Sequence, residues 1–159
     1  MTLGPKIGDG RTAEVFAWDE GRVLKLFRPA WARDVAESEA ELARRLYDAG
    51  VPSPAVFGVV QYDGRFGVIY ERIVGASLLD LLLADPEAVI PLAHQLAETH
   101  VTLNARRVAD LPTTRQRLAS ALNYAGREGG PLPADLRDQA LHTLATLPDG
   151  EALSHGDYH

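Results

Sequence analysis

Residues 8–27 read GDGRTAEVFAWDEGRVLKLF, and their pattern predicts the first elements of the fold. Two runs that are typical of β-strands, residues 13–18 and 22–27, flank Asp19-Glu20-Gly21. That connection has the length and the final glycine of a three-residue hairpin loop. The stretch therefore predicts an antiparallel hairpin close to the amino terminus.

Outward from the hairpin, apolar residues recur at helical spacing over residues 33–48. Gly50 ends this helix, and the prolines that follow it prevent its continuation. Two further strands are expected at residues 55–61 and 66–73, around a turn at Asp63-Gly64. The first part of the chain therefore reads as a small antiparallel sheet with one helix.

From Gly75 onward the pattern is helical. Ser77 and Asp80 have the spacing of a capping box, and Asp85-Pro86-Glu87 has proline at the first turn of a second helix. Further helices are expected at residues 114–125 and 134–147. This change predicts a lobe boundary near residues 74–76, and so two domains, residues 1–74 and 75–159.

Composition indicates a globular chain: 46% of its 159 residues are apolar. Its 22 acidic and 16 basic residues leave a net charge of −6, with no run of Lys or Arg, so no nucleic-acid surface is expected. No apolar stretch is long enough to predict a membrane span. The absence of cysteine excludes disulfides and thiolate metal sites and fits a cytoplasmic protein.

The residues that open the hairpin, GDGRTAEV at positions 8–15, match the glycine-rich loop G-x-G-x-x-G-x-V, with Ala13 in place of the third glycine. Glycine lets backbone N–H groups approach phosphate oxygens without a Cβ in the way. The same residues also suit a plain turn. Because the loop precedes a strand and does not open a helix, a dinucleotide-binding fingerprint is disfavoured.

Lys25 interrupts an apolar strand, and a period of two places apolar residues on both faces of that strand. We therefore expect its ammonium group to be partly buried and to need an anionic partner. Glu39 lies in the middle of a helical stripe formed by Val35, Leu42 and Leu46, where an unpaired carboxylate is costly. The two anomalies predict one ion pair. The alternatives are an exposed Lys25, and a Glu39 that binds a loop backbone or an arginine.

The chain ends in Ser154-His155-Gly156-Asp157-Tyr158-His159. The two histidines of this segment bracket a glycine and an aspartate and do not lie along a helix, so no metal site is expected. The segment looks like the first half of a phosphotransferase catalytic loop, in which an aspartate accepts the proton of the acceptor hydroxyl.

Taken together, the glycine-rich loop, Lys25, Glu39 and the His155-Gly156-Asp157 segment resemble, in order and approximate spacing, the aminoglycoside phosphotransferase and choline kinase-like family. The resemblance extends over essentially the whole chain. It implies an α+β, protein-kinase-like fold: a small antiparallel β N-terminal lobe with one pairing helix, then a partial helical C-terminal lobe. It also implies transfer of the γ-phosphoryl group of ATP or GTP, with Mg²⁺, to the hydroxyl of a small-molecule acceptor.

The resemblance assigns roles to matching residues. Lys25 would hold the α and β phosphates, Glu39 would orient Lys25, Asp157 would be the catalytic base, and His155 would brace its loop. The backbone of the glycine-rich loop would cover the phosphates, and the segment between the lobes would meet the adenine. The cofactor-binding residues expected in these two places are Gly8, Asp9, Gly10, Arg11, Thr12, Glu71 and Ile73.

The asparagine and the metal-binding aspartate that the family pattern has beyond Asp157 have no counterpart in this sequence. We therefore expect a truncated chain that is inactive alone, with magnesium ligands beyond its end and self-association through exposed apolar surface. The alternative function is a non-catalytic nucleotide-binding or regulatory module. The acidic balance would suit a cationic acceptor.

Overall fold

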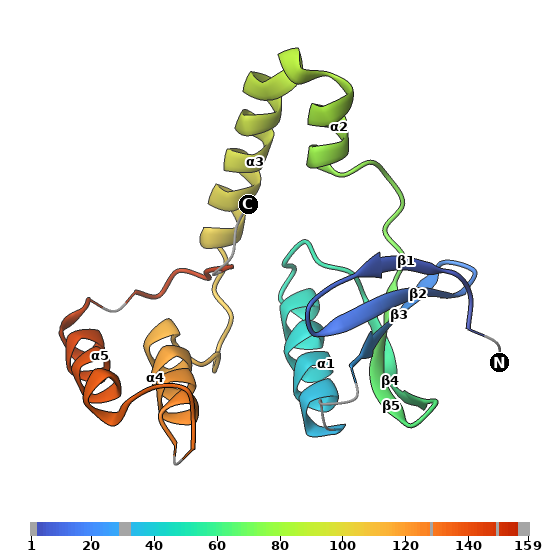
Figure 1. Cartoon of the computed structure of the whole chain (residues 1–159). Helices are drawn as coiled ribbons and strands as arrows, with labels where there is room; N and C mark the ends of the chain where they lie inside the picture. Colours follow the sequence, from blue (N-terminus) through green and yellow to red (C-terminus); the bar gives the residue numbers. More distant parts are fainter. Residues whose placement is uncertain (1–2, 29–32, 128, 149, 156–159) are drawn as a thin grey trace. The chain divides into compact units, whose positions relative to one another are not determined.

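The computed structural model describes residues 3–28, 33–127, 129–148 and 150–155. The chain is of the α+β class, as expected from the sequence (Figure 1). The strands are β1 (Lys6–Asp9), β2 (Ala13–Asp19), β3 (Arg22–Phe27), β4 (Val56–Tyr62) and β5 (Arg65–Glu71). The helices are α1 (Arg33–Asp48), α2 (Leu78–Ala84), a 3₁₀ turn η1 (Pro86–Ala88), α3 (Val89–Asn104), α4 (Thr114–Ala125) and α5 (Ala134–Thr146).

The chain divides into two compact units, residues 1–99 and 100–159. The first holds the sheet, α1, α2 and most of α3, and the second holds α4 and α5. The lobe boundary near residues 74–76 stays a prediction. Within the part of the chain that the structure describes, no helix is both long enough and apolar enough to cross a membrane.

The five strands form one antiparallel sheet in the order β1-β2-β3-β5-β4. The predicted hairpin is β2 and β3, and its turn carries Gly21 at φ +78°, where glycine avoids the strain that a Cβ would cause. Asp19 extends β2 and pairs with Arg22, so the connection is two residues long, not three. The central strand β3 therefore places Lys25 between Val15 of β2 and Val68 of β5.

Both faces of the sheet are covered by apolar side chains, as the alternation in β3 predicted. On the face toward α1, Phe27 and Val68 pack with Ala36 of the helix. On the opposite face, Leu24 and Leu26 are buried together with Ile69. Because each buried leucine contributes on the order of 1.5–3 kcal/mol, the strand that carries Lys25 is also a main source of stability.

Helix α1 has the predicted bounds, but its contact face differs from the predicted stripe. Leu42 is 37% exposed, whereas Ala36 and Ala40 are fully buried against the sheet. Small side chains let the helix backbone come close to the strands. Helix α1 therefore packs with its two alanines, and not with Leu42, facing the sheet. Glu39 stays on the edge of this face and is half-buried.

The remaining helices begin as their sequences indicated. Ser77 and Asp80 form a capping box at α2, and the Asp85 side chain caps the 3₁₀ turn that leads into α3. A second capping box, formed by Thr113 and Gln116 at α4, was not predicted. Arg115 of α4 donates to the carbonyl of Ala145, at the end of α5, and so links the two helices of the second unit.

Candidate functional site

Lys25 and Glu39 meet as predicted. The Lys25 Nζ donates to Glu39 Oε1 at 2.7 Å and to Oε2 at 2.9 Å, which joins the central strand to α1. The two side chains are 33% and 30% exposed, so the pair is partly buried and still reachable from solvent. The Lys25 ammonium also lies 5.4 Å from the centre of the Phe27 ring, a cation–π contact.

Tyr70 is a third member of this cluster that the sequence did not indicate. Its hydroxyl donates to Glu39 Oε1 at 2.8 Å, from β5. Burial raises the pKa of the Tyr70 phenol, and the neighbouring Glu39 carboxylate raises it further, so the hydroxyl stays a donor at neutral pH. Period two along β5 would have placed Tyr70 on the same face as Val68, but only the strand register brings it to Glu39.

The glycine-rich loop is a tight turn between β1 and β2. β1 ends at Asp9, and the Gly10 N–H donates to the Ala13 carbonyl at 2.9 Å. A Cβ on Gly8 would lie 3.3 Å from Val15 Cβ, and a Cβ on Gly10 would lie 3.3 Å from the Ala13 oxygen. The lack of a Cβ at both glycines therefore lets the turn pack tightly. It also leaves the backbone of the turn accessible to a ligand.

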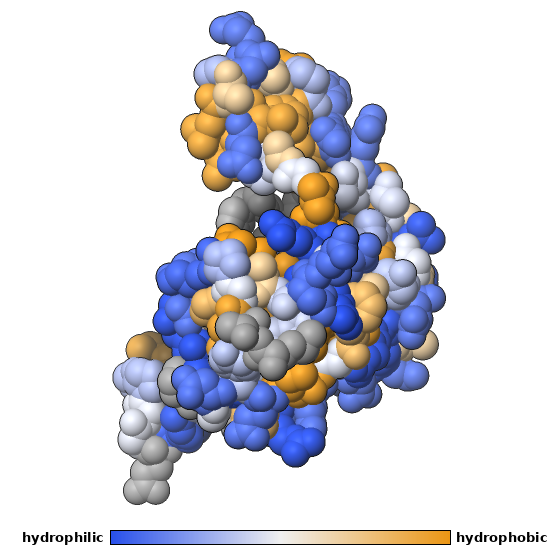
Figure 2. Space-filling view, turned by 90° about the vertical axis from the view of Figure 1, so that its right-hand side faces the viewer, coloured by the Kyte–Doolittle hydropathy of each residue, from blue (hydrophilic) through white to orange (hydrophobic). Residues whose placement is uncertain are grey.

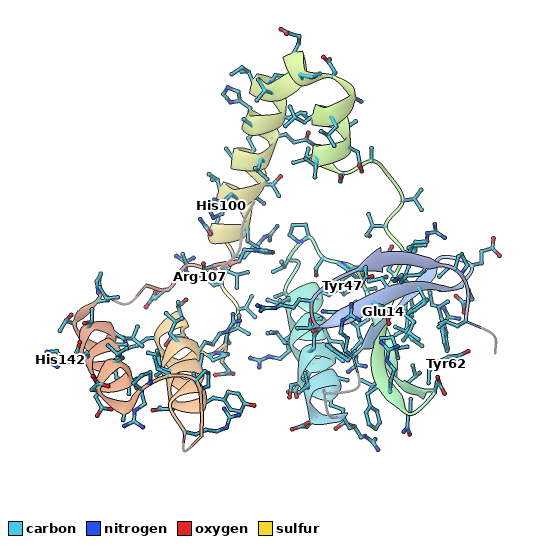
Figure 3. All side chains as sticks on the ribbon, viewed as in Figure 1. Glu14, Tyr47, Tyr62, His100, Arg107 and His142 are labelled. Carbon is cyan, nitrogen blue, oxygen red and sulfur yellow. The ribbon has the colours of Figure 1, made fainter. Side chains whose placement is uncertain are left out.

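Charged side chains surround this turn. Asp9 accepts from Lys6 at 2.8 Å and from Arg28 at 2.7 Å, and these cations, Lys6 first, hold the pKa of its carboxyl below the ordinary value. Glu14, labelled on β2 in Figure 3, accepts from Arg65 at 2.9 Å, and this hydrogen bond is the main cause of its lowered pKa. No local pattern indicated Arg28 or Arg65, because each arginine lies far along the chain from the carboxylate that it binds.

Glu71 and Ile73 lie at and beyond the end of β5. The Glu71 N–H donates to the Ala55 carbonyl at 2.9 Å, and the Glu71 carboxylate accepts from the Ala55 N–H at 3.1 Å. Glu71 thus ties the start of β4 to the end of β5. Ile73 lies outside the strand in which it was expected and is 69% exposed.

The residues expected to carry the catalysis lie in the second unit. His155 is exposed. Asp157 lies outside the described residues. Among the described residues, no group of three histidine, cysteine, aspartate or glutamate side chains is placed to hold a metal ion.

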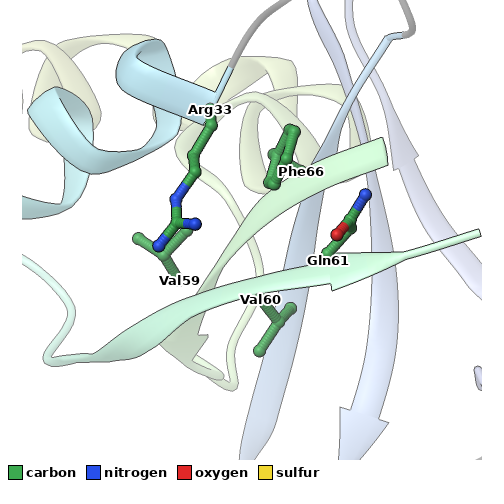
Figure 4. A pocket seen from close by; sticks show the side chains of 5 residues that line it. All are labelled: Arg33, Val59, Val60, Gln61 and Phe66. Carbon is green, nitrogen blue, oxygen red and sulfur yellow. The ribbon is translucent and has the colours of Figure 1, made fainter. Parts of the chain in front are cut away.

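The surface hollows among the described residues of the first unit include the following two. One is lined by Arg33, Val59, Val60, Gln61 and Phe66, on β4, β5 and the start of α1 (Figure 4). The other lies along one face of α3, between Ile90 and Ala97. Neither hollow is lined by a residue that the sequence analysis placed in the site.

The sequence model of the phosphotransferase enzyme family matches residues 5–159. No match is found among the curated proteins. Among solved structures, the chain is similar to the one described as the streptomycin–ATP–APH(2″)-IIa ternary complex, with 18% identity and a TM-score of 0.48. That match covers 92% of this chain and 51% of the other, so the chain spans about half the length of the matched protein.

Proposed function

Because this chain belongs to the phosphotransferase enzyme family, we propose that it takes part in transfer of the γ-phosphoryl group of ATP or GTP to a hydroxyl group of a small acceptor. The observation that carries this proposal is the double hydrogen bond between Lys25 and Glu39. It presents one ammonium group, held from two elements, beside the glycine-rich hairpin.

The charge balance supports a local anion site at this position. The chain has a net charge of −6, so its overall field does not attract a triphosphate. An ammonium group has three hydrogen-bond donors. Since two of those of Lys25 point to Glu39 and the side chain is 33% exposed, the third is available for a phosphate oxygen. Glu39 fixes the direction in which that donor points.

The other roles belong to the same proposal. The backbone of Gly8, Asp9, Gly10, Arg11 and Thr12 covers the phosphates. Glu71 and Ile73 border the adenine, Asp157 is the base and His155 braces it. The acceptor is a small molecule, and a cationic acceptor suits the acidic chain. The same proposal places the protein in the cytoplasm. Bound magnesium would neutralise the charge that develops on the phosphate oxygens during transfer.

Titration of the chain with a fluorescent ATP analogue tests the proposal. We expect saturable binding that competes with unlabelled ATP or GTP. Lys25→Ala should weaken it by about tenfold or more, corresponding to about 1.4 kcal/mol, and Glu39→Gln by roughly threefold to tenfold. Glu37→Gln is the matched control, because Glu37 lies on the same helix but is exposed and pairs with Arg33 at 2.7 Å. It should bind as the unaltered chain does.

Turnover is measured in parallel, with amino alcohols and aminoglycosides as acceptors. Turnover that Lys25→Ala abolishes supports the phosphotransferase. Nucleotide binding without turnover is the outcome expected both of a phosphotransferase chain that is inactive alone and of the non-catalytic nucleotide-binding module, so the turnover of this chain does not by itself separate the two. A chain that binds no nucleotide, or binds it equally well without Lys25, overturns the proposal.

A further inference from the structure

Arg28, the first residue after β3, holds the turn at the tip of the glycine-rich hairpin. Its Nη2 donates to Asp9 Oδ1 at 2.7 Å and to the Gly10 carbonyl at 3.0 Å. Its Nε lies 3.3 Å from the same carbonyl and 3.2 Å from that of Arg11. The Arg28 backbone N–H donates to the Thr12 carbonyl at 2.9 Å. One residue thus engages three successive carbonyl groups of the turn.

These contacts set the direction of the backbone N–H groups. A trans peptide is planar, so the N–H of each residue points away from the carbonyl of the residue before it. With the Gly10 and Arg11 carbonyls directed at the guanidinium, the N–H groups of Arg11 and Thr12 point away from it. Successive N–H groups that share a direction form an anion-binding concavity.

Asp9 balances the charge of this arrangement. Its carboxylate accepts from Arg28 and, on its other oxygen, from Lys6 at 2.8 Å. The guanidinium is therefore occupied by the turn, and the aspartate charge, which would repel a triphosphate, is neutralised by two cations. An isolated exposed ion pair contributes little to stability. Arg28, however, combines its ion pair with hydrogen bonds to several backbone carbonyls.

We propose that Arg28 is a positioning residue that holds the Gly10–Thr12 turn so that its N–H groups face bound triphosphate. The inference rests on the proposed function. In this role, Arg28 affects nucleotide binding through the planar fork of its guanidinium group, and not through its positive charge. A lysine keeps the charge but cannot reach two carbonyls and a carboxylate at once.

Arg28→Gln, Arg28→Lys and Arg22→Gln test the inference in the full chain. Arg22 is the matched control: it lies at the other end of β3, its side chain is 38% exposed against 42% for Arg28, and it pairs with Asp19. Circular dichroism and thermal melting verify that each variant folds. Two measurements follow, amide hydrogen exchange without ligand and affinity for the fluorescent ATP analogue.

The Gly10 amide, bonded to the Ala13 carbonyl, reports on the turn, and the Arg72 amide, bonded to the Gly21 carbonyl, reports on the far end of the hairpin. Both Arg28 variants should accelerate Gly10 exchange by about threefold to tenfold and leave Arg72 unchanged. Both should weaken nucleotide binding by a similar factor, whereas Arg22→Gln should change neither the Gly10 amide nor the affinity.

Unchanged Gly10 exchange in Arg28→Gln overturns the inference whatever the nucleotide does. Full affinity in Arg28→Lys with loss in Arg28→Gln overturns it in favour of a charge effect. If Gly10 exchange accelerates while the unaltered chain binds no nucleotide, the proposed function fails, and with it the claim that the turn faces triphosphate, although the contact of Arg28 with the turn is then demonstrated.

Discussion

Glu39 is the residue on which three hydrogen bonds converge, two from Lys25 and one from Tyr70. Such a carboxylate has little freedom to rotate, and its direction sets that of the ammonium group. Because Lys25 comes from β3, Tyr70 from β5 and Glu39 from α1, the cluster exists only when the helix is docked on the sheet. An ordered cluster of these three side chains therefore shows both that α1 is docked on the sheet and that Lys25 is held in place.

Tyr70→Phe removes one of these hydrogen bonds and leaves the ring in place. The free energy of unfolding should fall by about 1 kcal/mol, since the bond goes to a charged but partly exposed group. Nucleotide affinity should fall by about threefold, because Glu39 then holds Lys25 less firmly. Urea denaturation and titration with the ATP analogue measure the two effects.

Tyr62→Phe is the control for this variant. Tyr62 lies at the end of β4, where its ring packs edge-on against Trp18 at 6.1 Å between ring centres, in the cluster on the other face of the sheet. It should leave nucleotide affinity unchanged. Equal losses of affinity in both variants would show that the Tyr70 hydroxyl has no special effect on Lys25.

At the scale of elements, the pairing of β3 with β5 positions Lys25, and Gly67 permits it. A Cβ on Gly67 would lie 2.6 Å from the Lys25 carbonyl oxygen and 3.1 Å from Leu26 Cα. Both are backbone atoms of the central strand, which cannot move aside without breaking the ladder. The two strands therefore depend on a glycine at this one position.

Gly67→Ala should lower the free energy of unfolding by about 2–3 kcal/mol, as overpacking in a well-packed interior does. It should also weaken nucleotide binding, because the clash is with the backbone of Lys25 itself. Gly58→Ala, on β4, is the control, since a Cβ there meets no atom within 4 Å. Similar thermal melting of the two variants would contradict this account of the sheet.

At the scale of the whole molecule, large apolar side chains are exposed around α2. Ile73 is 69% exposed, Val74 87%, Leu79 63% and Leu83 72%. In the upper part of Figure 2, the surface over this helix is coloured orange, which marks hydrophobic residues. A helix that is apolar on all sides is normally covered, and contiguous exposed apolar surface favours association. The sequence predicted such a surface.

We expect the chain to self-associate at tens of micromolar, the range in which exposed apolar surface drives association. Sedimentation equilibrium measures the mass. The double variant Leu79→Glu and Leu83→Glu should return it to the monomer value. Leu147→Glu, which alters a leucine that is 50% exposed beyond α5, should not. A monomer at every concentration would contradict the prediction.

Local patterns were enough for most of the elements, though not for β1, and for one contact of the site. The α1 bounds, the capping box at Ser77 and the turn at Gly21 follow from neighbouring residues, because capping and turn formation are local effects. The Lys25 to Glu39 contact was also predicted, because two charges in otherwise apolar surroundings each need a partner, and the structure decided for this contact over an exposed Lys25 or another partner for Glu39.

Tertiary structure alone decided the rest. Tyr70 reaches Glu39, Gly67 meets Lys25 and Arg28 meets the glycine-rich turn through strand register and the end of β3, which bring together residues from 16 to 42 positions apart. The strand register cannot be read from the periodicity of the sequence, because it depends on how whole faces of the sheet and of α1 pack together. The same reason explains why α1 turned its alanines, and not Leu42, toward the sheet.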